Sequence, residues 1–191
     1  MIRSLPSVAA LAAIALALPA AAQDFSEGSE AREWGLYAET PARFTAEVID
    51  PLCELTGDCT EACGGGARQV VLRRLADDAW VFPLKNGQPA FNGAVADVQP
   101  YCGQTVEVDG LLIDDPEIGA TSVYLVQRIR PEGGEWRRAN LWTDDWAAKH
   151  PEAAGDGPWF RRDPRVLSEI EREGYLGLGA EADAAFIADW F

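Results

Sequence analysis

The sequence predicts a mainly β domain with some α-helix, built as a five-stranded, partly open barrel followed by a short helical C-terminal tail. Stretches in which apolar and polar residues alternate recur between residues 42 and 130, as in half-buried strands. A long connection separates the third of these stretches from the fourth, which suits a partly open Greek-key barrel. After Gly133-Gly134 the apolar pattern becomes helical.

Residues 1–22 have the features of a cleavable secretory signal peptide. Arg3 precedes an apolar run from Val8 to Leu18, and Ala20-Ala21-Ala22 supplies a small-residue cleavage site. The run is too short to span a bilayer comfortably, so an uncleaved anchor is the weaker alternative. We therefore expect a periplasmic or secreted protein.

The charge of the chain excludes some classes of partner. The 191 residues include 31 acidic and 16 basic side chains, which gives a formal net charge of -15. Nucleic acid and anionic lipid need a Lys/Arg surface, so we expect no nucleic-acid binding and no stable membrane insertion. A hydrophobic content of 48%, with seven Trp, indicates a globular chain.

The first half of the chain divides into an arm, three strands and a loop. Residues 23–41 are mostly polar or small and form an N-terminal arm, poorly ordered at its start. Strands are expected from 42 to Pro51, from 69 to 75 and from 79 to 84, with Asp77-Asp78 as the turn between the last two. Residues 52–66, rich in Cys and Gly, are expected to form a loop.

The remaining strands follow a long connection at 86–101, in which 94–98 forms a short helical turn. Residues 105–113 alternate clearly, and Gly110 suggests a bulge there. The last strand covers 122–130, where neither face is purely apolar. The barrel domain, with its Cys-rich loop, is expected to span 42–140.

The order of these strands and their connection is similar to that of an OB-fold. Residues 103–112 carry a G-x-x-V-x-V-x-G run that resembles the fourth strand of small exported OB domains. The resemblance covers roughly residues 42–130 and implies a fold without implying a ligand. Oligonucleotide binding by such a barrel needs aromatic residues in a basic groove, and the acidic charge balance argues against it.

Residues 141–191 are expected to form a helical C-terminal extension packed on the barrel. Thr143 can N-cap a helix that Pro151 ends, with two Asp residues in its first turn. Asp163 caps a second helix with Pro164 at its first position. A last helix begins at Ala180.

Four cysteines form the one constellation that could carry chemistry: Cys53, Cys59, Cys63 and Cys102. Because an even number of thiols is exported to an oxidising compartment, two structural disulfides are expected, in one of three pairings. The alternative is a metal site. The spacing lacks the close cysteine pairs of most zinc sites. It faintly resembles the spacing in vertebrate-type [2Fe-2S] ferredoxins, but its second gap is one residue too long for that pattern. A redox-active pair is a further alternative, although no C-x-x-C motif exists. We therefore expect no cofactor, with zinc or an iron-sulfur cluster as the alternatives.

One surface segment is distinctive, namely Trp159, Phe160, Arg161 and Arg162. Adjacent Trp and Arg side chains are typical of partner-binding hot spots. The competing interpretation is that the aromatics pin the tail to the barrel while the arginines pair with local acids. His150 is the only histidine, at a helix end, and no nucleophile motif accompanies it.

These observations favour an exported, disulfide-stabilised binding or accessory protein that is not an enzyme. Its partner, a protein or a small molecule, is not specified by the sequence. The alternative function is a metal-binding or redox protein that uses the four cysteines.

Overall fold

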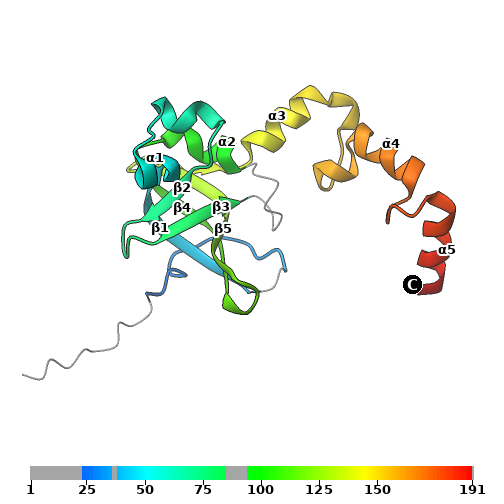
Figure 1. The fold of residues 1–191 in the computed structure, drawn as a ribbon, viewed down its shortest axis with the longest axis horizontal. Coiled ribbons are helices and arrows are strands. Elements are labelled where there is room, and N and C mark those ends of the chain that lie inside the picture. The colour runs from blue at the N-terminus through cyan, green and yellow to red at the C-terminus, as the bar shows by residue number, and fades with distance from the viewer. Residues whose placement is uncertain (1–22, 36–37, 85–93, 191) are drawn as a thin grey trace, which may run out of the picture.

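The computed structural model describes residues 23–35, 38–84 and 94–190. Its strands form one sheet in the order β3-β2-β1-β4-β5-β6, which curves into a barrel (Figure 1). The strands are β1 (Glu39–Ile49), β2 (Val71–Arg74), β3 (Trp80–Leu84), β4 (Thr105–Asp115), β5 (Ala120–Pro131) and the short β6 (Arg137–Arg138).

Pairing between β3 and β5 closes the barrel. Phe82 lies opposite Val123 and Leu84 opposite Leu125 in a parallel register, whereas the other pairs are antiparallel. The result is a closed five-stranded mixed barrel, not the partly open one that the sequence predicts. Alternation within a strand says which residues face inward, but it carries no information about which edges meet.

The helices are α1 (Pro51–Thr56), α2 (Ala94–Val98), α3 (Leu141–Lys149), α4 (Pro164–Glu173) and α5 (Ala180–Trp190). The expectation of a plain loop at 52–66 is wrong, because α1 and a 3₁₀ segment at Glu61–Gly66 lie there. The Asp50 carboxylate caps α1 by accepting the backbone N–H groups of Leu52 and Cys53. Pro51 therefore starts a helix as well as ending β1.

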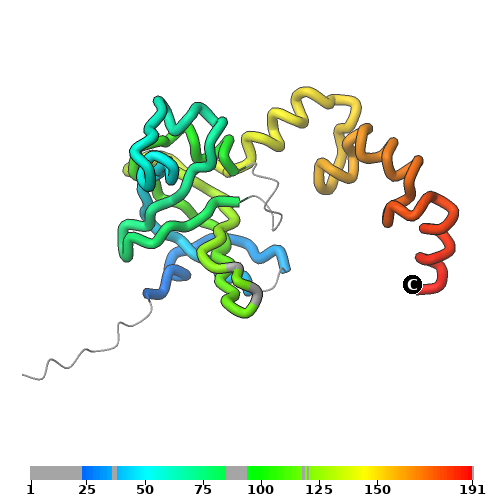
Figure 2. The backbone as a smooth tube through the Cα atoms, viewed as in Figure 1, coloured from blue at the N-terminus to red at the C-terminus, as the bar shows by residue number. Residues whose placement is uncertain are grey.

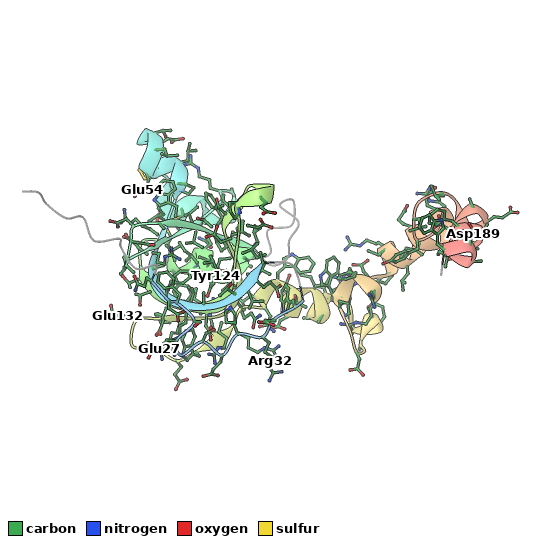
Figure 3. The ribbon with its side chains drawn as sticks, turned by 90° about the horizontal axis from the view of Figure 1, so that it is seen from below. Glu27, Arg32, Glu54, Tyr124, Glu132 and Asp189 are labelled. Carbon is green, nitrogen blue, oxygen red and sulfur yellow. A yellow bond between two sulfur atoms is a disulfide. The ribbon has the colours of Figure 1, made fainter. Side chains whose placement is uncertain are left out.

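The core fills the barrel interior. Buried side chains from all five strands meet there, among them Phe44, Leu72, Val81, Val108 and Tyr124. The Tyr124 hydroxyl donates to the Ala42 carbonyl at 2.7 Å, and Figure 3 shows this residue within the barrel. The barrel interior tolerates the buried tyrosine because this hydrogen bond satisfies its hydroxyl group.

A second apolar cluster lies on the other side of β4 and β5. Leu111, Ile113 and Leu125 are buried there, and Ala31 of the N-terminal arm packs against them. Both faces of these two strands are therefore partly covered. This explains why the sequence of the last strand shows no single apolar face.

A bulge between β4 and β5 adds to that irregularity. Asp109 lies opposite Arg128 and Gly110 opposite Val126, so Gln127 is the extra residue on β5. The predicted irregularity at Gly110 is confirmed, because the register shifts between Asp109 and Gly110. The extra residue reverses the alternation, which places Val126 and Ile129 on the same interior side.

The C-terminal extension leaves the barrel through α3. The α3 helix contacts α2, whereas α4 and α5 lie beyond it and away from the barrel (Figures 1 and 2). The sequence predicts an extension packed on the barrel, and in the structure that contact runs through α3. The aromatic side chains that could pack on the barrel instead pack on one another, as described below.

The start of α3 differs from the prediction. The helix begins at Leu141 and Asn140 occupies its N-cap position, so Thr143 lies inside the helix. The buried carboxylate of Asp97, on α2, accepts the Leu141 backbone N–H at 3.2 Å. A side chain from another helix therefore satisfies a backbone N–H group at the start of α3, and no local sequence pattern reveals such a contact.

The proposed signal peptide and the first half of the connection at 86–101 lie outside the described residues. Within the described part of the chain, no helix is both long enough and apolar enough to cross a membrane. The division into arm, barrel domain and extension stays a prediction.

Candidate binding surfaces

The four cysteines form two separate disulfides. Cys53 and Cys59 close a short loop around α1, and Cys63 joins Cys102 just before β4. Cys63 is buried against the barrel core, whereas Cys59 is exposed. This pairing is one of the three that the sequence allows. It ties the Cys-rich loop to the barrel, and disulfides of this kind are typical of proteins outside the cytoplasm.

Within the described residues, no group of three or more His, Cys, Asp or Glu side chains is placed to hold a metal ion. The sulfur atoms that would ligate zinc are bonded to one another in pairs. The expectation that the protein has no cofactor stays a prediction, which a thiol titration can test.

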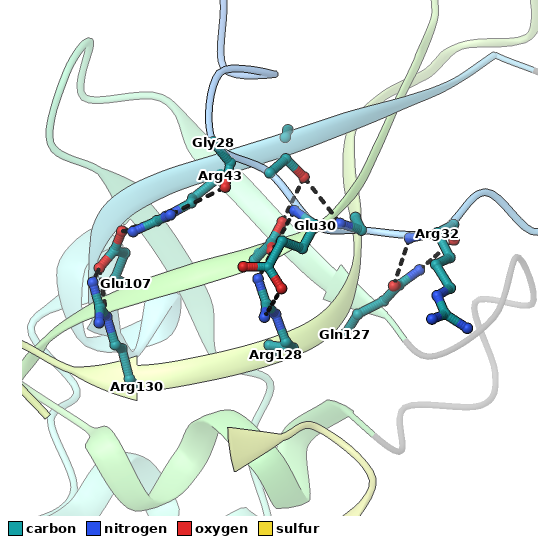
Figure 4. Close-up of polar contacts among 12 residues, drawn as sticks. Gly28, Glu30, Arg32, Arg43, Glu107, Gln127, Arg128 and Arg130 are labelled. Atoms are coloured by element: carbon teal, nitrogen blue, oxygen red, sulfur yellow. Dashed lines mark hydrogen bonds and ion pairs between the residues drawn. The ribbon is translucent and has the colours of Figure 1, made fainter. Parts of the chain in front are cut away.

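Arginines of β1 and β5 gather around one tryptophan on the outer face of the barrel. The guanidinium groups of Arg43, Arg128 and Arg130 lie 5.2, 4.9 and 4.6 Å from the Trp136 ring centre. Glu107 lies between Arg43 and Arg130 and pairs with both (Figure 4). The cluster is neutralised by its own carboxylates, so it serves to hold structure together more than to attract an anion.

Burial and charge act in opposite directions on Glu107. Burial alone would raise the pKa of this carboxyl group, but hydrogen bonds from Arg130 and Arg43, together with their charges, bring the pKa below its usual range. Glu107 is therefore ionised at neutral pH and fixes both arginines.

The N-terminal arm is fastened across this face. The fully buried Asp109 accepts the Ser29 hydroxyl at 2.6 Å and the Glu30 backbone N–H at 2.9 Å. Gln127 exchanges two hydrogen bonds with the backbone of Arg32 (Figure 4). The arm is thus bound to the barrel from Ser29 to Arg32, while the poorly ordered start stays a prediction.

Phe25 anchors the arm at its beginning. Its ring packs edge-on against Phe44 at 5.8 Å, and the Arg74 guanidinium lies 4.1 Å from its centre. The alternation of the strands predicts neither this anchor nor the arginine cluster. A usable signal was present, because Glu107 and Asp109 on one strand face Arg128 and Arg130 on the next.

The structure separates the four residues of the distinctive surface segment. Trp159 is half-buried and packs against Trp142 and Trp146, at 4.7 and 5.7 Å between ring centres. Phe160 is 46% exposed, and Arg161 is exposed as well. Arg162 donates to the carbonyls of Ala153 and Gly157 instead of pairing with acids. A partner-binding role for the segment stays a prediction.

A buried carboxylate joins α3 to α4. Asp163 caps α4 as predicted, and one of its oxygens accepts the Trp146 indole N–H at 2.9 Å. Hydrogen bonds from Arg165 and Trp146 hold the pKa of Asp163 well below its usual range. The tryptophan cluster and this carboxylate therefore give the extension its own small core.

Beyond that small core, the extension exposes many apolar side chains. Nine of the fourteen large hydrophobic side chains that are exposed in the described residues lie between 141 and 191. Tyr175, Leu178 and Trp190 are 70%, 58% and 69% exposed. Exposed apolar residues occur singly on most soluble proteins, whereas here most of them belong to the extension.

A groove runs between α4 and the loop that follows it. Val166 and Ile170 of α4 form one side, and Tyr175 and Leu176 of the loop form the other. Trp159 also lines it, so the groove begins at the tryptophan cluster. The sequence marks the apolar stripe of α4 but not the groove, because the loop's position depends on a residue of α5.

No family model matches the chain, and no curated protein and no solved structure is significantly similar to it.

Proposed function

We propose that this chain is an exported, non-enzymatic binding or accessory protein, in which an OB-type barrel stapled by two disulfides carries a helical extension that binds a partner. The observation that carries the proposal is the gathering of exposed apolar side chains on α4, α5 and the loop between them. Burying such a surface against a partner releases it from water, which is the main favourable contribution to association.

Three features support the rest of the proposal. The closed barrel has five strands and a connection containing α2 between β3 and β4, an arrangement compatible with an OB-type barrel. The disulfides fit an oxidising compartment. Residues 1–22 supply the pattern of a signal for reaching it.

A thiol titration distinguishes the proposed function from the competing one, a metal or redox protein that uses free cysteines. The full chain is expressed with its own signal and purified without reductant, and its thiols and intact mass are measured. We expect no free thiol, a mass lower by four hydrogens and a mature chain that begins near Gln23. Four reactive thiols with bound metal would overturn the proposal in favour of the alternative.

The binding surface is tested by site-specific photo-crosslinking in cells. A photoreactive amino acid is placed at Tyr175 or Leu178 on the extension and, as a control, at Leu75 on the barrel, which is 50% exposed. We expect a discrete adduct from the extension positions and none from Leu75. An adduct confined to Leu75, or no adduct at any position, would contradict a binding role for the extension.

A further inference from the structure

The groove beside α4 is lined largely by apolar side chains. It is an open surface depression with a volume of about 600 Å³. Val166 and Ile170 are spaced four residues apart, so their side chains lie on one face of the helix. The groove therefore offers an apolar surface beside one face of α4.

The second side of the groove is fixed by a buried carboxylate. Asp183 of α5, only 3% exposed, accepts the backbone N–H groups of Leu176 and Leu178. Gly174 makes this approach possible, because a Cβ atom there would lie 2.2 Å from an Asp183 oxygen. The loop is thus held in place before any partner arrives, which lowers the entropy lost on binding.

The charge around the groove is negative. From Pro164 to Trp190 the sequence has six carboxylates and two arginines. Arg172 pairs with Glu169 and Glu173, so this group of three side chains keeps one negative charge. Arg165 also lines the groove, and Asp163 neutralises it. Glu169 and Glu173 themselves line the groove. A partner with cationic side chains beside an apolar surface would complement both features.

This charge discriminates among possible occupants. A second copy would bring the same acidic residues to the groove, and an anionic membrane would be repelled as well. Strand addition needs an open sheet edge, and the described residues of the extension after Asn140 contain no strand. An amphipathic helix lies against an apolar groove through residues spaced three and four apart, which suits the apolar lining that Val166, Ile170 and Leu176 provide.

We infer that the groove between α4 and the 174–178 loop binds a basic amphipathic helix of a partner protein. The apolar stripe of that helix lies on Val166, Ile170 and Leu176, and its Lys or Arg side chains face Glu169 and Glu173. This inference rests on the proposed binding function and names the class of partner.

The test uses the purified full chain and three labelled peptides of 18 residues. One is a Leu/Lys helix with a single apolar stripe, one replaces every Lys by Glu, and one scrambles the Leu/Lys order so that no stripe forms. Fluorescence anisotropy measures binding at low and high salt. We expect the Leu/Lys helix to bind at least tenfold more tightly than either other peptide and to weaken as salt rises.

Matched variants locate the site. Leu176→Asp changes a groove residue that is 45% exposed, whereas Leu55→Asp changes an apolar residue of α1 that is 73% exposed and away from the groove. We expect at least tenfold weaker binding from Leu176→Asp and no change from Leu55→Asp. The double variant Glu169→Lys/Glu173→Lys should reverse the preference, so that the Leu/Glu peptide binds more tightly than the Leu/Lys peptide. Circular dichroism checks that each variant is folded.

Several results would overturn the inference. These are equal binding of the three peptides, binding unaffected by Leu176→Asp, or a dimer in sedimentation that Leu176→Asp dissociates, which would assign the groove to a second copy. Failure of the peptides together with crosslinks from Tyr175 would reject the basic helix but keep the proposed function. Failure of both experiments would reject both.

Discussion

At the scale of single residues, Asp109 connects the arm to the barrel. Its carboxylate is fully buried and is shared by Arg128, Ser29 and the backbone of Glu30. A buried charge with this many partners is costly to break, because removing one side leaves the other unpaired.

We therefore expect Asp109→Ala to lower the free energy of unfolding by about 3 kcal/mol, as measured by urea denaturation. Glu30→Ala is the matched control, since Glu30 pairs with the same arginine but its side chain is 71% exposed. The control should cost less than about 1 kcal/mol. Equal losses in the two variants would contradict a special role for the buried carboxylate.

A second residue-scale prediction concerns Asp163 and acid. Because its pKa is lowered in the folded protein, the ionised group stabilises the fold above its unfolded pKa, about 3.9. That contribution is lost as pH falls below about 4 toward the folded value. We expect the fluorescence signal of the tryptophan cluster to be lost over this range, and Asp163→Asn to remove part of the pH dependence.

The measurement is the difference between the wild-type and variant acid titrations, because other carboxylates of lowered pKa, such as Asp77, titrate in both proteins. Asp145→Asn is the control, since this exposed residue pairs only on the surface with Lys149. If Asp163→Asn and wild type gave parallel curves, the carboxylate would not link α3 to α4.

At the scale of elements, the bulge of β4 and β5 depends on a small residue. A Cβ atom at Gly110 would lie 2.2 Å from the Leu125 carbonyl oxygen, so the strands could not keep this register. We expect Gly110→Ala to destabilise the protein by about 3 kcal/mol or more, as overpacking against rigid backbone does.

Gly133→Ala is the comparison for that prediction. Gly133 has a φ of 70° but open space around it, so the cost should be about 1 kcal/mol, from backbone strain alone. Thermal unfolding followed by circular dichroism distinguishes the two variants. A smaller loss for Gly110→Ala than for Gly133→Ala would show that the strands adjust freely at the bulge.

The two disulfides also act at the scale of elements, and they should contribute unequally. Cys63 and Cys102 are 39 residues apart, whereas Cys53 and Cys59 are separated by 6. Closing the longer loop removes more entropy from the unfolded chain, so we expect losses of about 4 and 2 kcal/mol for the respective double Ala variants. Urea midpoints of the two variants measure these losses. A larger loss for the Cys53–Cys59 variant than for the Cys63–Cys102 variant would contradict the prediction.

At the scale of the whole molecule, the extension and the barrel are stabilised by different contacts. The α4 and α5 helices contact each other, and Figure 3 shows Asp189 of α5 at the far end of the extension from the barrel. We expect a chain that ends at Glu173 to unfold within about 0.5 kcal/mol of the full chain, as for changes outside a core. A larger loss, measured by the urea midpoint of the strand signal, would show that α5 supports the barrel.

The sequence alone determined the features that neighbouring residues control. Alternation predicted the strands, and the Asp163-Pro164 pair predicted the start of α4, because a cap and a fixed φ act within one turn. The same Asp-Pro pattern at Asp50-Pro51 starts α1. There the alternating strand pattern that precedes Pro51 hides the helix start, because a proline that begins a helix also ends a strand.

Only the tertiary structure decided which distant residues meet. Closure of β3 on β5, the pairing of Cys63 with Cys102 and the cap that Asp97 gives α3 each join segments tens of residues apart. The groove likewise needs Asp183 of α5 to hold the loop beside α4. Local propensity cannot specify such contacts, because they depend on how the whole chain excludes water from its apolar faces while satisfying its buried polar groups.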